Sequence, residues 1–219
     1  MNTVVTRLFL PADESGQWEA APDLPLLALL LSELHRGADG GTFAVGFPAW
    51  QDPGATTLGT FGRTCDVFAP ARDGLSAMLD APKVRRLVRD HCVATPIRPI
   101  PEDQVAGYAE FHRCRRHDRV SPAAIRRMLQ PEQAVAKPES LTGRVRTLAA
   151  EGLSISMIRE RLDACPTGPH FHYRTTHTAL SAQLVIRRRL TDAPGPLAFT
   201  SFGFSRGGAV PVIDLAWGR

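Results

Sequence analysis

The residues best suited to bind a polyanion lie in one arginine-rich stretch near the middle of the chain. Six arginines fall within fifteen positions: Arg113, Arg115, Arg116, Arg119, Arg126 and Arg127. Asp118 is the only acidic residue among them, so these cations repel one another unless a polyanion is bound. The alternative is a surface that only keeps the protein in solution, but such surfaces usually mix both signs of charge. The stretch therefore favours nucleic-acid binding.

Two local patterns suggest how these arginines are presented. Ser121 and Pro122 predict the start of a helix that carries Arg126 and Arg127, and on its exposed side these side chains can reach the phosphates of a duplex. Arg113 and Arg115 are alternate residues of an expected extended segment, so their side chains point the same way.

His35 is the candidate for acid–base chemistry. An imidazole changes its charge near neutral pH, which suits it to accept a proton. His35 follows the apolar residues of a predicted helix and precedes Arg36 and Gly37, at a helix end whose dipole favours a cation. A capping or surface role is the alternative from its position alone.

Other groups of reactive residues do not form a known site. His170, His172 and His177 lack the spacing of a metal motif, and the four cysteines contain no C-x-x-C pair, so we expect no metal, no disulfide framework and no cofactor. The stretch Gly203 to Gly208 lacks the Gly-Lys-Ser/Thr ending of a P-loop. It is either a tight turn or a place where the backbone beside Arg206 approaches a phosphate or a helix closely.

The chain has 219 residues, of which 43% are apolar and 22% charged, as expected for a globular protein. Residues 1–80 carry a net charge of −6 and residues 81–219 a net charge of +10, so the basic character belongs to the later part. Arginine accounts for 24 of the 26 basic residues, which suits bidentate phosphate contacts but is also what a GC-rich genome produces. No apolar run is long enough to span a membrane and no signal peptide is evident, so we expect a cytoplasmic protein.

The elements that must position these residues predict an α+β fold. Leu27, Leu30, Leu31 and Leu34 share one helical face, and this helix lies between a strand at Val4 to Leu10 and a possible hairpin made of 42–47 and 60–68. Asp73 is expected to cap a short helix, and a helix at 83–92 and a strand at 93–97 follow. The order β-α-β-β-α-β indicates a ferredoxin-like (RRM-like) domain over residues 1–100.

Pro96, Pro99 and Pro101 form a stiff connector, after which residues 101–219 are expected to form a second, arginine-rich α+β domain. Packing helices are predicted after Ser121, around Val145 and after Ser154. Strands are predicted from Phe171 onward, at 183–186 and at 197–202.

Several stretches of this sequence together resemble the type I-F CRISPR-associated endoribonuclease. They are Leu31-Ser-Glu-Leu-His-Arg36, Val45-Gly-Phe-Pro48, the arginine-rich stretch from Arg113, and Phe199-Thr-Ser-Phe-Gly-Phe-Ser-Arg-Gly-Gly208. The similarity covers most of the chain, while the segment 130–168 matches poorly.

The resemblance implies a function in antiviral defence: a subunit that cuts CRISPR repeat RNA at the base of its stem-loop and stays on the 3′ hairpin, among other subunits of a type I-F Cascade complex. The implied reaction needs no metal. The ribose 2′-hydroxyl attacks the phosphate, leaving a 2′,3′-cyclic phosphate and a 5′-hydroxyl.

The resemblance also assigns roles to residues. His35 matches the catalytic histidine, and Thr175 stands where the family commonly has a serine that holds the attacking sugar. Arg113 and Arg115 match the segment that reads base pairs, although the second position is more often glutamine. Arg126 and Arg127 match the arginine helix, with Arg116 and Arg119 as additional RNA contacts. Phe202 replaces a usual tyrosine and keeps only a ring for stacking, beside Arg206 in the glycine-rich segment.

Two alternatives remain at this point. The first is a hairpin-binding structural subunit that has lost cleavage, which the replacement at Phe202 favours. The second is an unrelated arginine-rich RNA-binding protein without enzymatic activity.

Overall fold

The computed structural model describes residues 3–11, 24–37, 43–52, 59–100, 102–114, 120–130, 137–162, 169–174, 181–194, 199 and 203–217. They form an α+β protein, as the sequence predicts. The chain divides into two compact units, one made of Met1–Arg113 with Gly168–Arg219 and the other of Cys114–Thr167. The boundary expected at residue 100 falls inside the first unit, just before its second sheet.

The first sheet of this unit is antiparallel and has the strand order β2-β3-β1-β4, with β5 also paired to β1. Its strands are β1 (Val4–Phe9), β2 (Ala44–Gly46), β3 (Thr64–Ala69), β4 (Val93–Ala94) and β5 (Arg98–Pro99). The predicted pairing of the second and third strands is confirmed, with Ala44 opposite Phe68. Of the strand expected at 93–97, only Val93–Ala94 is a strand, β4. A further short strand, β5, follows this range, and both pair with β1.

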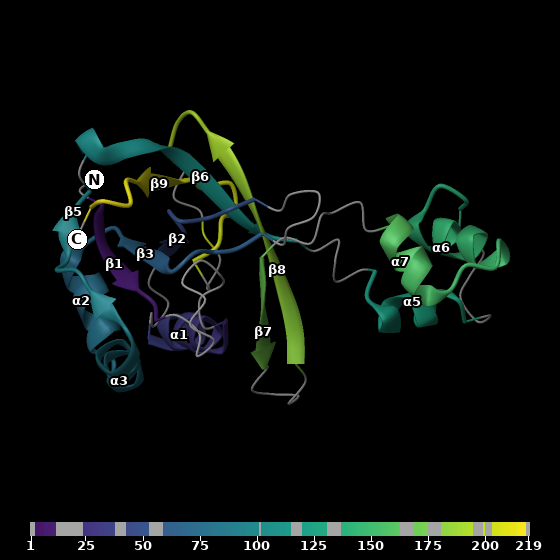
Figure 1. Ribbon diagram of the computed structural model, residues 1–219, viewed down its shortest axis with the longest axis horizontal. Coiled ribbons are helices and arrows are strands. Elements are labelled where there is room, and N and C mark those ends of the chain that lie inside the picture. Colours follow the sequence, from purple (N-terminus) through teal and green to yellow (C-terminus); the bar gives the residue numbers. More distant parts are fainter. Residues whose placement is uncertain are drawn as a thin grey trace. The chain divides into compact units, whose positions relative to one another are not determined.

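Three helices accompany this sheet: α1 (Leu24–Gly37), α2 (Arg72–Asp80) and α3 (Pro82–His91) (Figure 1). The predicted leucine face of α1 is confirmed, since Leu27, Leu30, Leu31 and Leu34 are all fully buried. The expectation that Asp73 caps α2 is wrong. Ala71 occupies the N-cap without a side-chain hydrogen bond, and Asp73 lies within the first turn, where its charge still suits the helix dipole.

The second sheet has the strand order β7-β8-β6-β9 and follows a short 3₁₀ turn, η1 (Glu102–Gln104). Its strands are β6 (Val105–Arg113), β7 (His170–Arg174), β8 (Ser181–Thr191) and β9 (Val210–Ile213). The strand expected at 183–186 is much longer in the structure. Of the strand expected at 197–202, only Phe199 is described, and it forms an isolated bridge with Ser205.

An aromatic cluster joins the two sheets. The Phe47 ring, just after β2, lies 5.3 Å from the Phe111 ring of β6, and the Trp50 ring lies 5.5 Å from the same ring. Phe61 packs against both Phe47 and Trp50. These rings are almost fully buried, so the sheets share one hydrophobic core.

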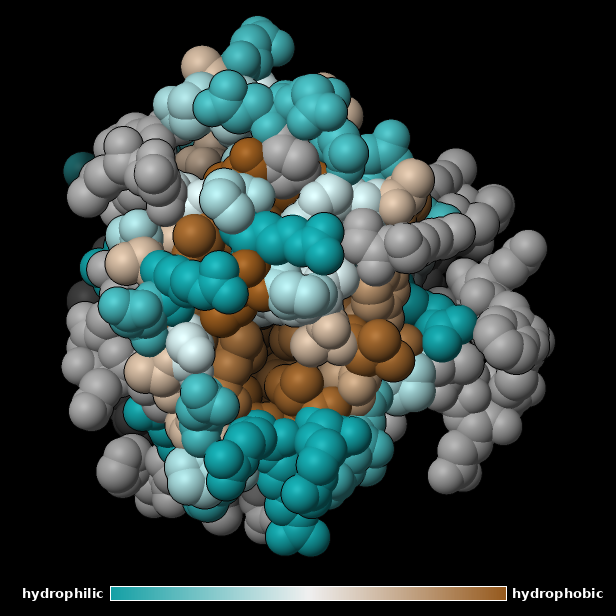
Figure 2. Space-filling view, turned by 90° about the vertical axis from the view of Figure 1, so that its left-hand side faces the viewer, coloured by the Kyte–Doolittle hydropathy of each residue, from teal (hydrophilic) through white to brown (hydrophobic). Residues whose placement is uncertain are grey.

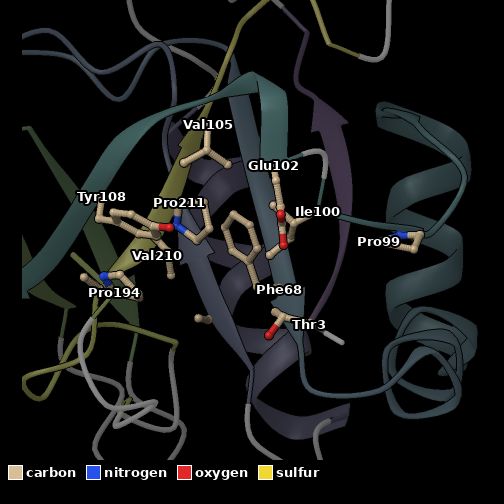
Figure 3. Close-up of a pocket in the computed structure, with 12 residues that line it drawn as sticks. Thr3, Phe68, Pro99, Ile100, Glu102, Val105, Tyr108, Pro194, Val210 and Pro211 are labelled. Atoms are coloured by element: carbon tan, nitrogen blue, oxygen red, sulfur yellow. The ribbon is translucent and has the colours of Figure 1, made fainter. Parts of the chain in front are cut away.

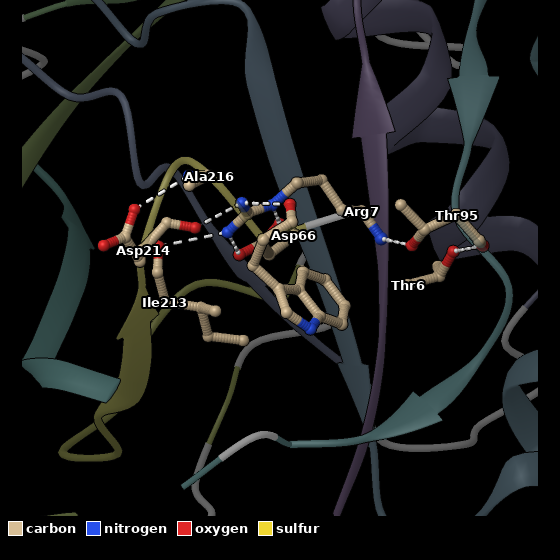
Figure 4. Close-up of polar contacts among 8 residues, drawn as sticks. Thr6, Arg7, Asp66, Thr95, Ile213, Asp214 and Ala216 are labelled. Atoms are coloured by element: carbon tan, nitrogen blue, oxygen red, sulfur yellow. Dashed lines mark hydrogen bonds and ion pairs between the residues drawn. The ribbon is translucent and has the colours of Figure 1, made fainter. Parts of the chain in front are cut away.

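Arg7 of β1 fixes the C-terminal end of the chain to the first sheet (Figure 4). Its guanidinium pairs with Asp66, the residue directly opposite on β3, at 2.7 and 2.9 Å. It also donates to the backbone oxygens of Ile213, Asp214 and Trp217 at 3.1, 2.6 and 2.9 Å. Arg7 and Asp66 are only 0% and 1% exposed, so this charge pair lies within the core.

The second unit is a small helical cluster of α5 (Pro122–Met128), α6 (Leu141–Ala150) and α7 (Ile155–Leu162). Its core contains Val120, Ile125, Val145, Ile158 and Leu162. The helices predicted after Ser121, around Val145 and after Ser154 are confirmed. The Ser121 hydroxyl accepts from the Ala124 amide and the Ser154 hydroxyl from the Met157 amide, so both serines cap the helices that follow them. In the described part of the chain, no helix is long and apolar enough to cross a bilayer.

Candidate functional site

His35 lies in the last turn of α1 and is half-buried. The leucine face fixes this helix in the core, so the position of the imidazole is set by packing rather than by a mobile loop. Arg36, the next residue, is exposed and forms an ion pair with Glu33 one turn earlier. The helix end thus presents an imidazole and a guanidinium in adjacent positions.

The helix that carries His35 packs against β7, the strand that ends at Arg174. Thr175 is the next residue in the sequence and lies outside the described residues. The backbone therefore brings the helix of the expected proton acceptor beside the strand that leads to the expected ribose-binding residue. These two segments are about 140 residues apart in the sequence, and the packing of α1 on β7, which pairs with β8, brings them together.

The first residue of the glycine-rich segment near the C-terminus, Gly203, must be a glycine for structural reasons. Gly203 has a φ of +76°, and its carbonyl accepts a 3.1 Å hydrogen bond from the Val45 amide. A side chain there would meet the Phe43 ring at 2.9 Å. Ser205 follows and bonds the Phe111 backbone through both its amide and its hydroxyl. The glycine thus allows the segment to pack between β2 and β6.

The predicted RNA-binding residues divide between the two units. Arg113 is exposed at the end of β6, and Arg206 is exposed three positions after Gly203. Arg126 and Arg127 are exposed in the last turn of α5, while Ile125 beside them is fully buried. The remaining predicted residues, Arg115, Arg116, Arg119 and Phe202, lie outside the described residues.

A cluster on β6 and β8 was not predicted from the sequence. Arg189 bonds Glu110 with two nitrogens at 3.0 and 2.8 Å, and the His112 Nε2 lies 2.5 Å from the same carboxylate. The Arg189 hydrogen bonds lower the pKa of Glu110, and that of His112 acts in the same direction. In the sequence, Glu110 and His112 stand at alternate positions of a strand, which places both side chains on one face. Arg189, which pairs with Glu110, is 79 residues away in the sequence, so the local pattern does not indicate it.

An apolar hollow of about 540 Å³ opens between the two sheets of the first unit (Figure 2). Tyr108 and Pro211 line one side of it and Phe68 and Ile100 the other (Figure 3). None of the predicted site residues that the structure describes lines this hollow, and His35 is not among its lining residues.

The described cysteines and acids form no metal centre. Cys65 and Cys114 are buried, Cys92 is half-buried, and burial raises the pKa of the Cys92 thiol to about 11. Within the described ranges, no three His, Cys, Asp or Glu side chains are grouped as metal ligands would be.

Residues 24–213 match the family described as CRISPR-associated protein (Cas_Csy4). The matched region includes α1 with His35, the arginine-rich stretch, the β7–β8 hairpin and the glycine-rich segment. The chain belongs to the Cas_Csy4 family. A comparison with curated proteins finds no match.

The Cas_Csy4 family consists of endoribonucleases that process CRISPR repeat RNA in type I-F systems. Family membership therefore confirms the resemblance stated from the sequence. It also makes the alternative of an unrelated arginine-rich RNA-binding protein wrong.

Proposed function

We propose that this Cas_Csy4 protein cuts CRISPR repeat RNA at the base of its stem-loop without a metal ion. The ribose 2′-oxygen attacks the phosphorus as His35 takes its proton, and the bond from phosphorus to the 5′-oxygen breaks. The products are a 2′,3′-cyclic phosphate and a 5′-hydroxyl, whose oxygen takes up a proton as it leaves. The family match across α1, with His35 half-exposed at its end, carries this proposal.

Thr175 and Phe202 complete the proposed site. A threonine hydroxyl can hold the attacking ribose by a hydrogen bond, as the serine usual at this position would. Phe202 offers a ring that packs or stacks but no hydroxyl to orient the histidine or the sugar. Gly203, the next residue in the sequence, accepts a hydrogen bond from the Val45 amide of β2, and Phe202 itself lies outside the described residues.

We further propose that the protein acts in the cytoplasm and stays on the 3′ hairpin of the product among other type I-F Cascade subunits. The strand order β2-β3-β1-β4, with α1 after β1 and α2 and α3 after β3, supports a ferredoxin-like arrangement for residues 1–100. Residues 101–219 would then supply the arginine-rich hairpin-binding domain.

Incubation of the protein with an end-labelled repeat RNA in EDTA tests the proposed reaction. We expect one cut at the stem base and a product that carries a 2′,3′-cyclic phosphate. Cleavage that requires added magnesium, or a product with a 3′-hydroxyl, would contradict the mechanism.

Arg126→Ala combined with Arg127→Ala should weaken RNA binding and flatten its salt dependence. Both side chains are exposed in the last turn of α5, so their loss removes phosphate contacts without disturbing the buried Ile125. For duplex phosphates, the slope of log affinity against log salt falls by about 0.9 for each lost contact. Filter binding at several salt concentrations measures this slope.

The matched control for this variant is Arg72→Ala combined with Arg98→Ala. These two arginines are also exposed, but they lie on α2 and β5 of the first unit. The control should keep the slope of the original protein. If the two double variants behave alike, Arg126 and Arg127 do not contact phosphate.

A hairpin-binding subunit without cleavage is the second candidate, because Phe202 stands where the family usually has a tyrosine. Phe202→Tyr should then decide between the two. In an active enzyme, the restored hydroxyl should raise the cleavage rate under single-turnover conditions with little change in affinity. Tight binding without cutting by both proteins would favour the structural subunit.

A further inference from the structure

Helix α3 presents a row of basic side chains to solvent. Lys83, Arg85, Arg86 and Arg89 are all exposed, while Val84 is buried on the opposite side. We refer to these four basic residues as the α3 cationic face. Hydrophilic residues gather along the lower edge of Figure 2, below the brown hollow.

The charge of this face is only partly compensated. Asp90 is the one acid of α3, and it is shared by Arg89 at 2.8 Å and Arg86 at 3.6 Å. The hydrogen bond from Arg89 lowers the pKa of Asp90. Lys83 and Arg85 form no ion pair within the described part of the chain. Helix α2 adds Arg72, Asp73 and Asp80, so the two helices together remain basic.

A groove of about 430 Å³ lies at the C-terminal end of α3. Arg63, Arg89 and His91 bring hydrogen-bond donors to it, and Asp90 also lines it. The other lining residues include apolar ones, namely Phe9, Leu10, Pro11 and Val93, and Val93 is 70% exposed. A groove that combines cations with apolar surface fits single-stranded nucleic acid, because the cations bind phosphates and the apolar side chains pack against bases.

We propose that the α3 cationic face and its groove bind unpaired RNA that adjoins the stem-loop. This proposal rests on the proposed function, since it needs the same RNA to be held elsewhere on the protein. An acidic protein partner is the less favoured occupant. Protein interfaces usually have aromatic or apolar anchors at their centre, whereas the solvent side of α3 carries only charged residues between Lys83 and Asp90.

Binding measurements with two RNAs test this proposal. One RNA is a type I-F repeat stem-loop alone, and the other is the same stem-loop with unpaired nucleotides on both sides. Both carry a 2′-deoxy sugar at the cut site to prevent cleavage. The original protein should bind the flanked RNA more tightly and with a steeper salt dependence, and RNAs with only one flank then show which side is held.

Lys83→Gln combined with Arg85→Gln should remove most of the extra affinity that the flanked RNA has over the bare stem-loop. The slope for the flanked RNA should fall by about 0.7 for each lost phosphate contact, as for single strands, while binding of the bare stem-loop stays unchanged. Asp90→Asn should have the opposite effect, because it leaves Arg86 and Arg89 without their shared acid. The Arg72→Ala and Arg98→Ala double variant is the control that loses the same charge elsewhere in this unit.

The outcomes separate this proposal from the proposed function. If the original protein binds neither RNA, the proposed function fails. If it binds the bare stem-loop tightly and no α3 variant changes the affinity for the flanked RNA, the proposal for α3 is overturned and its cations are left to an acidic protein. If an α3 variant loses affinity equally for the bare stem-loop and the flanked RNA, the proposal is also overturned, because the α3 cationic face would then contact the stem.

Discussion

His35→Ala should abolish RNA cleavage and leave RNA binding intact. Loss of a general base typically costs about 10² to 10⁴ in rate, which exceeds the expected loss from a positioning contact such as that of Thr175. The fold should tolerate this change. His35 is only half-buried in the last turn of α1, and the fully buried leucines of the same helix carry its packing.

The rate and the affinity must be measured separately for this variant. Single-turnover cleavage with excess protein gives the rate of the chemical step, and binding to a 2′-deoxy RNA gives the affinity. His112→Ala is a matched histidine control, since His112 contacts Glu110 on β6 and should not affect cleavage. Equal cleavage by His35→Ala and the original protein would remove the imidazole from the mechanism.

Local patterns in the sequence were sufficient to predict the helices and much of the first sheet. The spacing of Leu27, Leu30, Leu31 and Leu34 places them on one face of a helix, and that face is buried. Ser121 and Ser154 precede helical stretches and do cap them. These signals act between residues a few positions apart, so they can be read without knowing the fold.

The pairing of distant strands could not be predicted in the same way. The second sheet places β6 beside both β8 and β9, and the chain leaves the first unit between β6 and β7 to form the helices of the second. A boundary placed at a proline-rich connector therefore fell within the first unit. Periodicity reports which face of a strand is buried, but it does not report which strand lies next to it.

The candidate site shows the same division. The place of His35 at the end of a leucine-rich helix made it a candidate for acid–base chemistry but also suited a cap or surface residue. The family resemblance alone assigned it the catalytic role, as it did the roles of Thr175 and Phe202. The basic residues of α3 can be read from the sequence. That they are all exposed to solvent follows from the packing of α3, which buries Val84 on the opposite side. Neither the helix of His35 nor the strand before Thr175 indicates by itself that the two segments pack together.

The sequence contains an indication that Arg7 forms a buried ion pair. Arg7 is a single charged residue within the apolar strand Val4–Phe9, and such a residue is stable there only when a partner neutralises it. Asp66 occupies the equivalent place in β3, directly opposite. The sequence could have indicated this pair, but not the three backbone oxygens near the C-terminus that complete its contacts.

Asp66→Ala should destabilise the protein strongly. Removing one partner of a buried ion pair leaves an uncompensated charge, which typically costs about 3 to 5 kcal/mol. Burial raises the pKa of Asp66 while the hydrogen bonds and charge of Arg7 oppose this, so the carboxylate depends on Arg7. Denaturant unfolding, followed by circular dichroism, measures the free energy of unfolding. The control is Glu151→Ala, because both partners of its ion pair with Arg161 are exposed, at 50% and 66%, and such pairs contribute about 0 to 1 kcal/mol.

Replacing both partners, Arg7→Met with Asp66→Leu, distinguishes a simple ion pair from an anchor of the C-terminal end. A buried pair that only neutralises itself can often be replaced by apolar residues without loss of stability. Here the guanidinium also donates to the backbone oxygens of Ile213 and Trp217 in buried surroundings, so the double variant removes that donor from both. The Asp214 oxygen loses the same donor but keeps a 3.1 Å hydrogen bond from the Trp217 amide. Each unsatisfied buried acceptor costs about 1 to 3 kcal/mol. We therefore expect the double variant to remain destabilised, and recovery of the original stability would show that the carbonyl contacts contribute little.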